Sequence, residues 1–125
     1  MLENELSGQV VDTAFRIHSR LGPGLFESVY EEVLCFELQK QGLSIERQKT
    51  IPIKWGDVTL NHAFKADIII EKTVLLEIKS VELLSKVHYK QVLTYLKLTG
   101  IKLGLLINFN EALIKDGIYR IANGL

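Results

Sequence analysis

Two acidic residues and a lysine near the middle of the chain are the side chains best suited to chemistry. Asp67 lies in one run rich in isoleucine, and Glu77 and Lys79 lie in the next run of aliphatic residues. The polar tripeptide Glu71–Thr73 separates the two runs. Branched aliphatic runs on either side of a short polar segment predict a β-hairpin.

The register of this hairpin decides whether the two carboxylates meet. If Ile70 pairs with Val74 across a three-residue turn, Asp67 lies directly opposite Glu77. Opposed residues of an antiparallel pair point to the same face, with Cβ atoms about 4.5–5.5 Å apart. A two-residue loop would set Asp67 against Leu76 and place charge on the wrong face. We therefore expect the first register, with the two carboxylates side by side.

Two carboxylates this close repel each other unless a proton, the ammonium of Lys79 or a cation offsets their charge. Mg²⁺ commonly uses one or two protein carboxylates and keeps several waters for reaction. Asp67 followed by Glu77-x-Lys79 thus supplies two oxygen ligands and an ammonium, a set suited to hydrolysing a phosphodiester. The plain alternative is a surface ion pair between Glu77 and Lys79, which would contribute little.

Length and composition predict one ordinary globular domain spanning residues 1–125. Hydrophobic residues make up 47% of the chain and charged residues 24%, and no apolar run approaches the length of a membrane span. The first residues lack a basic and then apolar signal, so we expect a cytoplasmic protein. The single cysteine, Cys35, cannot form an intrachain disulfide and is expected to be a small core residue.

Lysine plus arginine equals aspartate plus glutamate, at 15 each. Proteins that bind nucleic acid usually carry a basic surplus, because neutralising phosphates supplies much of the affinity. A nucleic-acid substrate would therefore have to be held by local basic patches, by a bound metal or by a second subunit.

The hydrophobic periodicity predicts an α/β fold with a mixed central sheet flanked by helices. A helix between two strands makes a crossover, so the strand that carries Glu77 should run parallel to the apolar strand that follows. The expected elements are helices at 3–21, 25–41 and 82–98, strands at 44–55, 59–70, 74–80 and 102–109, and a short helix or edge strand at 114–122.

The second helix carries two acids that project together with a tyrosine. Glu27, Tyr30 and Glu31 are three and four residues apart. A carboxylate in the first helical turn, such as Glu27, is favoured by the helix dipole and needs no further role. The functional alternative is that Glu27 reaches the sheet as a third metal ligand.

The third helix aligns Gln91 and Tyr95 on one face. Neither polar group can be deeply buried without a hydrogen-bond partner. They are either a satisfied core pair or polar groups that face the hairpin site. Trp55, at the turn before the acidic strands, could cap the core or line a groove, and a place in the core is expected.

An ordered set of motifs resembles a known family. The segment Gly24-Leu-Phe-Glu27-Ser-Val-Tyr30 is similar to the motif of the GxxExxY proteins, which are related to the PD-(D/E)XK nuclease superfamily with its restriction-endonuclease-like fold. The proline that often precedes the superfamily's aspartate is replaced by Ala66. The other matching elements are Ala66-Asp67, Leu76-Glu77-Ile78-Lys79, His88-x-x-Gln91-x-x-x-Tyr95-Leu96 and Gly104-Leu-Leu-Ile-Asn108-Phe-Asn110.

The resemblance implies a role for each matched position. Asp67 and Glu77 would bind a divalent ion, Mg²⁺ or Mn²⁺, and Lys79 would orient or activate the attacking water. Glu27 would be the acidic partner from the helix and a metal ligand.

The resemblance also implies that Gln91 and Tyr95 form the RecB-like Gln-x-x-x-Tyr element near the catalytic centre. The expected activity is metal-dependent hydrolysis of nucleic acid, with DNA favoured over RNA, and a homodimer would help a chain this small to span a duplex. One alternative is a nuclease-fold module that binds nucleic acid or a protein partner without cutting. Another is a metal hydrolase acting on a small phosphorylated molecule.

Overall fold

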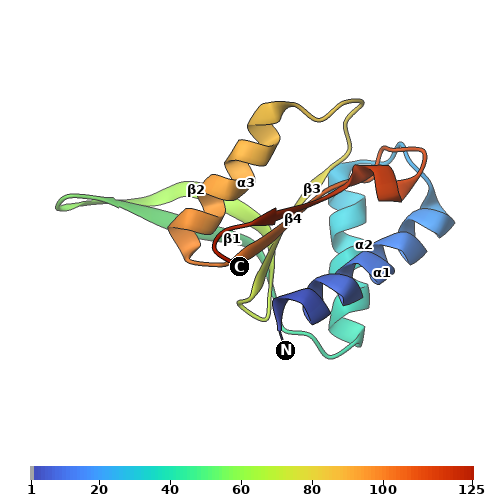
Figure 1. Cartoon of the computed structure of the whole chain (residues 1–125), viewed down its shortest axis with the longest axis horizontal. Helices are drawn as coiled ribbons and strands as arrows, with labels where there is room; N and C mark the ends of the chain where they lie inside the picture. Colours follow the sequence, from blue (N-terminus) through green and yellow to red (C-terminus); the bar gives the residue numbers. More distant parts are fainter. Residues whose placement is uncertain (1) are drawn as a thin grey trace.

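The computed structural model describes residues 2–125 and arranges them in three layers, with one sheet between a helix pair and a single helix (Figure 1). The predicted order of elements and the α/β fold class are confirmed. The elements are α1 (Glu3–Leu21), α2 (Glu27–Lys40), β1 (Ile45–Trp55), β2 (Val58–Ile70), β3 (Val74–Lys79), α3 (Lys86–Thr99), β4 (Leu103–Asn108), a 3₁₀ turn (Ile114–Gly117) and β5 (Ile118–Ala122).

The sheet has five strands in the order β1-β2-β3-β4-β5. Only β3 and β4 run parallel, because α3 connects them as a crossover, and the other neighbours are antiparallel. All six residues of β4 are buried, as its uninterrupted apolar sequence predicts. The last segment forms both the 3₁₀ turn and an edge strand.

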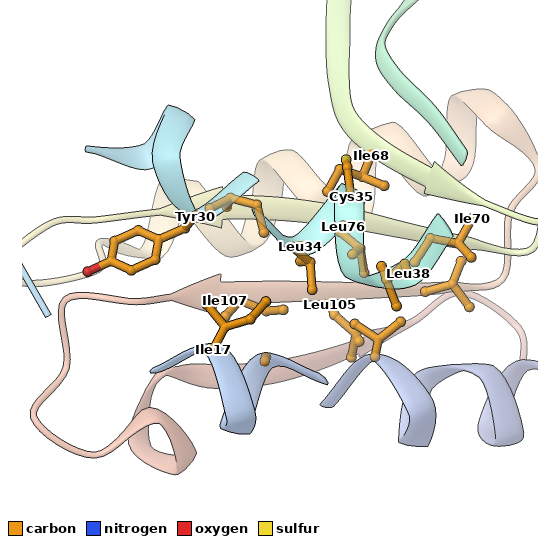
Figure 2. Close-up of a cluster of buried hydrophobic side chains, with 14 of the residues drawn as sticks. Ile17, Tyr30, Leu34, Cys35, Leu38, Ile68, Ile70, Leu76, Leu105 and Ile107 are labelled. Atoms are coloured by element: carbon orange, nitrogen blue, oxygen red, sulfur yellow. The ribbon is translucent and has the colours of Figure 1, made fainter. Parts of the chain in front are cut away.

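The larger core lies between the sheet and the α1–α2 pair (Figure 2). Tyr30 is fully buried there and its ring stacks on Phe109 at a centroid distance of 4.5 Å. Its hydroxyl donates a hydrogen bond to the carbonyl of Gly22 (2.6 Å) and accepts one from the amide of Leu25 (3.2 Å). Through these two hydrogen bonds, Tyr30 holds the backbone of the α1–α2 loop in place. Cys35 is buried in the same core, as expected.

The other face of the sheet is covered by α3, whose Val92 and Leu96 are buried against it. β4 makes room for α3 with a glycine, since a Cβ on Gly104 would lie 2.7 Å from Cγ1 of Val92. The helix begins at Lys86, four residues later than the periodicity indicates. The backbone amide of Ser85 donates a hydrogen bond to Nδ1 of His88, which fixes the start of the helix.

The β1–β2 hairpin extends beyond the body of the molecule as a two-stranded arm, defined here as residues 49–65 (Figure 1). Trp55, at its tip, is 79% exposed, so its expected place in the core is wrong. The physical reason is that α3 covers the sheet only as far as Ile51 and Phe64. Searched over residues 2–125, the chain has no helix with the length and hydrophobicity of a bilayer span.

Candidate active site

Asp67 and Glu77 face each other where β2 and β3 part. The predicted register is confirmed up to the pair Ile68–Leu76, the last pair of that ladder. Beyond this pair, hydrogen bonds from backbone amides to side-chain carboxylates take the place of hydrogen bonds between the two backbones. The amide of Asp67 donates a hydrogen bond to Oε1 of Glu77 (3.2 Å), and the amide of Ile78 donates one to Oδ2 of Asp67 (2.8 Å). Each carboxylate is thus held by the opposite strand.

The two carboxylates are shielded from water, and this changes their protonation. Glu77 is 7% exposed, and its burial, together with the negative charge of Asp67, raises the pKa of its carboxyl to about 8. Burial also raises the pKa of Asp67, while its hydrogen bond from Ile78 acts in the opposite direction. Ionising both carboxyls therefore costs free energy, and a bound proton or cation would reduce that cost.

Lys79 supplies positive charge to the pair. It is half-buried, and its ammonium lowers the pKa of both Asp67 and Glu77. The strand end that carries it is fixed by Asn108, a buried residue of β4. The side chain of Asn108 accepts a hydrogen bond from the amide of Val81 (3.1 Å) and donates one to its carbonyl (2.9 Å).

A polar network that sequence reasoning did not assign to the site reaches Asp67 from β1 and α2. Arg47 Nε donates a hydrogen bond to Oε2 of Glu31 at 2.6 Å. The side-chain amide of Gln48 donates to Oε1 of Glu31 (2.7 Å) and to Oδ1 of Asp67 (3.2 Å). Gln48 adopts a left-handed backbone conformation, with φ of 51°, which side chains other than glycine rarely adopt inside a strand.

Glu31 could have been found from the sequence. It precedes Cys35 and Leu38 by four and seven residues, so all three share one helical stripe, and all three are buried. A carboxylate on a buried stripe requires partners, here Arg47 and Gln48. The left-handed backbone of Gln48 has no comparable signal, because glutamine has no preference for it.

Glu27 lies at the end of β3 rather than between the two acids. Its Oε1 accepts a hydrogen bond from the amide of Ser80 at 3.3 Å, one residue after Lys79. Within residues 2–125, no three acidic, histidine or cysteine side chains gather closely enough to form a metal cluster. The structure therefore brings Asp67, Glu77 and Lys79 together and leaves Glu27 beside the strand end.

Tyr95, on α3, lies within electrostatic reach of the acidic pair. Its ring stacks on Phe64 at a centroid distance of 3.9 Å. Partial burial raises the pKa of its hydroxyl, and the charges of Glu77 and Asp67 raise it further, so the phenol lies within electrostatic reach of both. Gln91, one turn earlier on α3, is exposed.

The donor set fits a hard divalent cation. Two carboxylates are the number that Mg²⁺ commonly takes from a protein, and the pKa values of Asp67 and Glu77 are raised by burial and, to a smaller extent, by neighbouring carboxylates. Mn²⁺ has the same preference for oxygen.

Comparisons with known proteins point to one superfamily. The family model of the PD-(D/E)XK nuclease superfamily matches residues 4–121. A solved structure titled "Crystal structure of SSO0001" is similar at 22% sequence identity and a TM-score of 0.48, covering 93% of this chain. The present chain spans 66% of the length of that protein. No curated protein matches the chain.

Proposed function

Because the chain belongs to the PD-(D/E)XK nuclease superfamily, we propose that it is a metal-dependent nuclease with DNA as the favoured substrate. The observation that carries the proposal is the pair of shielded carboxylates, Asp67 and Glu77, facing each other beside Lys79.

The proposed reaction is hydrolysis of a phosphodiester by water. Asp67 and Glu77 would hold the metal through their carboxylate oxygens. When bound, Mg²⁺ or Mn²⁺ supplies Lewis acidity and lowers the pKa of a coordinated water. Lys79 positions the attacking water and stabilises the negative charge that builds on the phosphate as the P–O ester bond breaks.

The remaining proposed residues surround this centre. Tyr95 and Gln91 lie on α3, where the phenol is within electrostatic reach of the carboxylates and the exposed amide could meet a phosphate. Glu27 remains proposed as the acidic metal-binding partner from α2. Its place at the Lys79 end of β3, beside Ser80, supports this role.

Cleavage of labelled nucleic acids with Mg²⁺, with Mn²⁺ and with chelator tests the proposal. The panel contains single- and double-stranded DNA and RNA. We expect Asp67→Asn, Glu77→Gln and Lys79→Gln each to lower the cleavage rate by about 100-fold or more. Matched substitutions outside the site, Asp116→Asn and Lys115→Gln, should leave it unchanged. Undiminished cleavage in all three site variants would remove the mechanism.

A second candidate is a nuclease-fold module that binds nucleic acid or a protein without cutting. It is favoured by the absence of a three-residue metal cluster within residues 2–125 and by the equal numbers of acidic and basic residues. Thermal melting with metal or chelator separates the two candidates. A bound ion at 100 times its dissociation constant stabilises the fold by about 2.7 kcal/mol, and Glu77→Gln should abolish that increment. If neither Mg²⁺ nor Mn²⁺ changes the melting temperature and no substrate is cut, the module is the better description.

A further inference from the structure

The arm concentrates positive charge that the chain as a whole lacks. It carries Lys49, Lys54 and Lys65, with His62, against a single acid, Asp57. The complete chain is neutral, with 15 residues of each sign. The part of the chain outside the arm is therefore net acidic, although residues 83–110 carry four lysines and no acid. The arm is thus one of two local basic segments that could hold a polyanion.

The outer half of the arm also exposes apolar side chains. Two cross-strand pairs, Trp55–Val58 and Ile53–Leu60, share one face of the ribbon. Trp55 is 79% exposed, Val58 55% and Leu60 51%. Exposed apolar groups gathered on one projecting element usually mark a contact surface.

The opposite face of the outer arm carries the pair Lys54–Thr59. Nearer the body, beyond a register shift between Ile51 and Ile53, the pair Thr50–Lys65 adds a second lysine. Lys54 and Lys65 are exposed, and neither takes part in the ion pairs found within residues 2–125. Lys49, by contrast, is held by Glu46 at 3.1 Å. Lys54 and Lys65 are thus the ammonium groups available to phosphates.

The arm leads directly into the candidate active site. β2 runs from Val58 at the tip to Asp67, a span of about 30 Å at the usual rise per residue of a strand. One turn of B-form DNA covers about 34 Å, so a duplex lying along the arm would extend about one turn from the acidic pair. At the base of the arm, Phe64 stacks on Tyr95, whose hydroxyl lies within electrostatic reach of both carboxylates.

We propose that the arm enters the major groove of double-stranded DNA and positions one strand over the acidic pair. The proposal rests on the proposed nuclease function and names its substrate class. A two-stranded ribbon fits the major groove of B-form DNA, which is about 12 Å wide. The major groove of an A-form RNA duplex is too narrow and deep for protein side chains to read.

A second copy of this chain is the competing occupant. A two-fold symmetric dimer through the apolar face of the arm would pair that face with its own copy. Lys54, which lies on the opposite face, would point away from such a contact and gain no partner. The phosphates of a duplex instead complement the exposed lysines of the arm.

The position of the only tryptophan provides a direct test. The protein is titrated in chelator, so that nothing is cut, with a 20-base-pair DNA duplex, its single strand and the corresponding RNA duplex. We expect the DNA duplex to quench and blue-shift the emission of Trp55, and the RNA duplex to bind at least about tenfold more weakly. Unchanged emission at saturating DNA, or equal binding of RNA duplex, would overturn the proposal.

Charge variants locate the binding surface independently of fluorescence. With labelled DNA, Lys54→Gln/Lys65→Gln should bind about tenfold more weakly at 0.15 M salt. The slope of log K against log salt should shrink by about 1.8, or about 0.9 for each phosphate that is no longer neutralised. The control pair Lys102→Gln/Lys115→Gln is exposed outside the arm and should leave the slope unchanged. Equal effects of the two pairs would contradict the proposal, provided circular dichroism shows both folded.

Two further outcomes separate the competing explanations. A shift of Trp55 emission that follows protein concentration without DNA, with a dimer in sedimentation, would assign the arm to a second copy and overturn the proposal. Binding through the arm without cleavage under any metal would support this inference while the nuclease function fails. If the protein cleaves DNA and Lys54→Gln/Lys65→Gln does not affect cleavage, the nuclease function is supported and this inference is overturned.

Discussion

Glu77 is buried, and it lies beside a second carboxylate, that of Asp67 on the neighbouring strand. Its carboxylate accepts a hydrogen bond from the amide of Asp67, which lowers the pKa of Glu77. Burial and the charge of Asp67 outweigh that effect and raise the pKa to about 8. The site therefore has a free-energy cost when it holds no cation, and this cost should be visible in stability.

In chelator, the free energy of unfolding should fall as the pH rises from about 5 to 8. Glu77 binds its proton more tightly in the folded chain than in the unfolded chain, where its carboxyl has the ordinary glutamate pKa of 4.5. The stabilising effect of that proton is fully present below about pH 4.5 and is lost as the pH rises through about 8. The linkage slope from one such group is at most about 1.4 kcal/mol per pH unit.

Urea unfolding at pH 5, 6, 7 and 8 measures this slope. Glu77→Gln should remove this group's part of it, and Glu32→Gln, an exposed glutamate of α2, should not. A slope that survives unchanged in Glu77→Gln would mean that Glu77 is ionised in the folded protein throughout this range.

The backbone of Gln48 predicts an unusual order of stabilities. We expect Gln48→Gly to be more stable than Gln48→Ala by about 1 kcal/mol. Both variants lose the amide that contacts Glu31 and Asp67, so their difference reports the backbone. A positive φ costs a residue with a Cβ about 1–2 kcal/mol, which exceeds the roughly 0.5–1 kcal/mol by which glycine weakens an ordinary strand. Thermal melting should show alanine as the more stable variant at the control position Thr50.

Glu77 and Gln48 show how much of the site can be predicted from the sequence. Asp67 and Glu77 could be paired beforehand, because strand alternation and a three-residue turn leave one register that keeps charge together. The bridge through Gln48 could not, because it depends on a local backbone conformation and on how closely α2 approaches β1. The periodicity of hydrophobic residues predicts neither the backbone conformation of Gln48 nor the distance between α2 and β1.

At the scale of elements, the packing of α3 on β4 determines where Tyr95 lies. The two elements approach closely because Gly104 has no side chain beneath Val92 and Leu96. Any added volume there pushes on the helix that carries Tyr95.

Gly104→Ala should destabilise the fold by about 1–3 kcal/mol. The new Cβ would lie 2.7 Å from Cγ1 of Val92, so α3 or the side chain must shift. Combining it with Val92→Ala should recover part of the loss, and a double-mutant cycle by urea unfolding measures the coupling. The control Gly8→Ala, where a Cβ meets nothing within 4 Å inside α1, should stabilise the protein. Additive losses would show that the two sites do not compete for space.

Element boundaries could be predicted where caps or breaks are local, and less well where tertiary packing decides. The bounds of α1 follow from its apolar stripe and the Gly22–Gly24 break. The exposed place of Trp55 was not predictable, because its large apolar side chain and strand position favour burial in most proteins. Only the limited reach of α3 over the sheet exposes it.

At the scale of the whole molecule, the arm and the body have different sources of stability. The body buries two clusters of apolar side chains on the two faces of the sheet. In the outer arm, residues 52–63, Ile53 is half-buried and the other side chains are exposed. The outer arm therefore depends on its own ladder and contributes little to the core.

Replacing residues 52–63 with Asn-Gly should leave the body folded. The turn would join Ile51 to Phe64, which are already paired, and Asn-Gly suits a two-residue hairpin loop. We expect the melting temperature to change by no more than about 5 °C, because no fully buried side chain is removed. Circular dichroism and thermal melting check this. Loss of the cooperative transition would show that the outer arm is part of the folding unit.

The location of the single tryptophan has a practical consequence for studies of folding. Its indole is already largely hydrated in the native state, so global denaturation alters its surroundings very little. An unfolding curve recorded by indole emission would have a small amplitude dominated by fraying of the hairpin tip. Its midpoint would report the fraying of the tip and would differ from that from far-ultraviolet circular dichroism even when the body unfolds in one cooperative step. Such a difference should not be taken as evidence of an intermediate in the unfolding of the body.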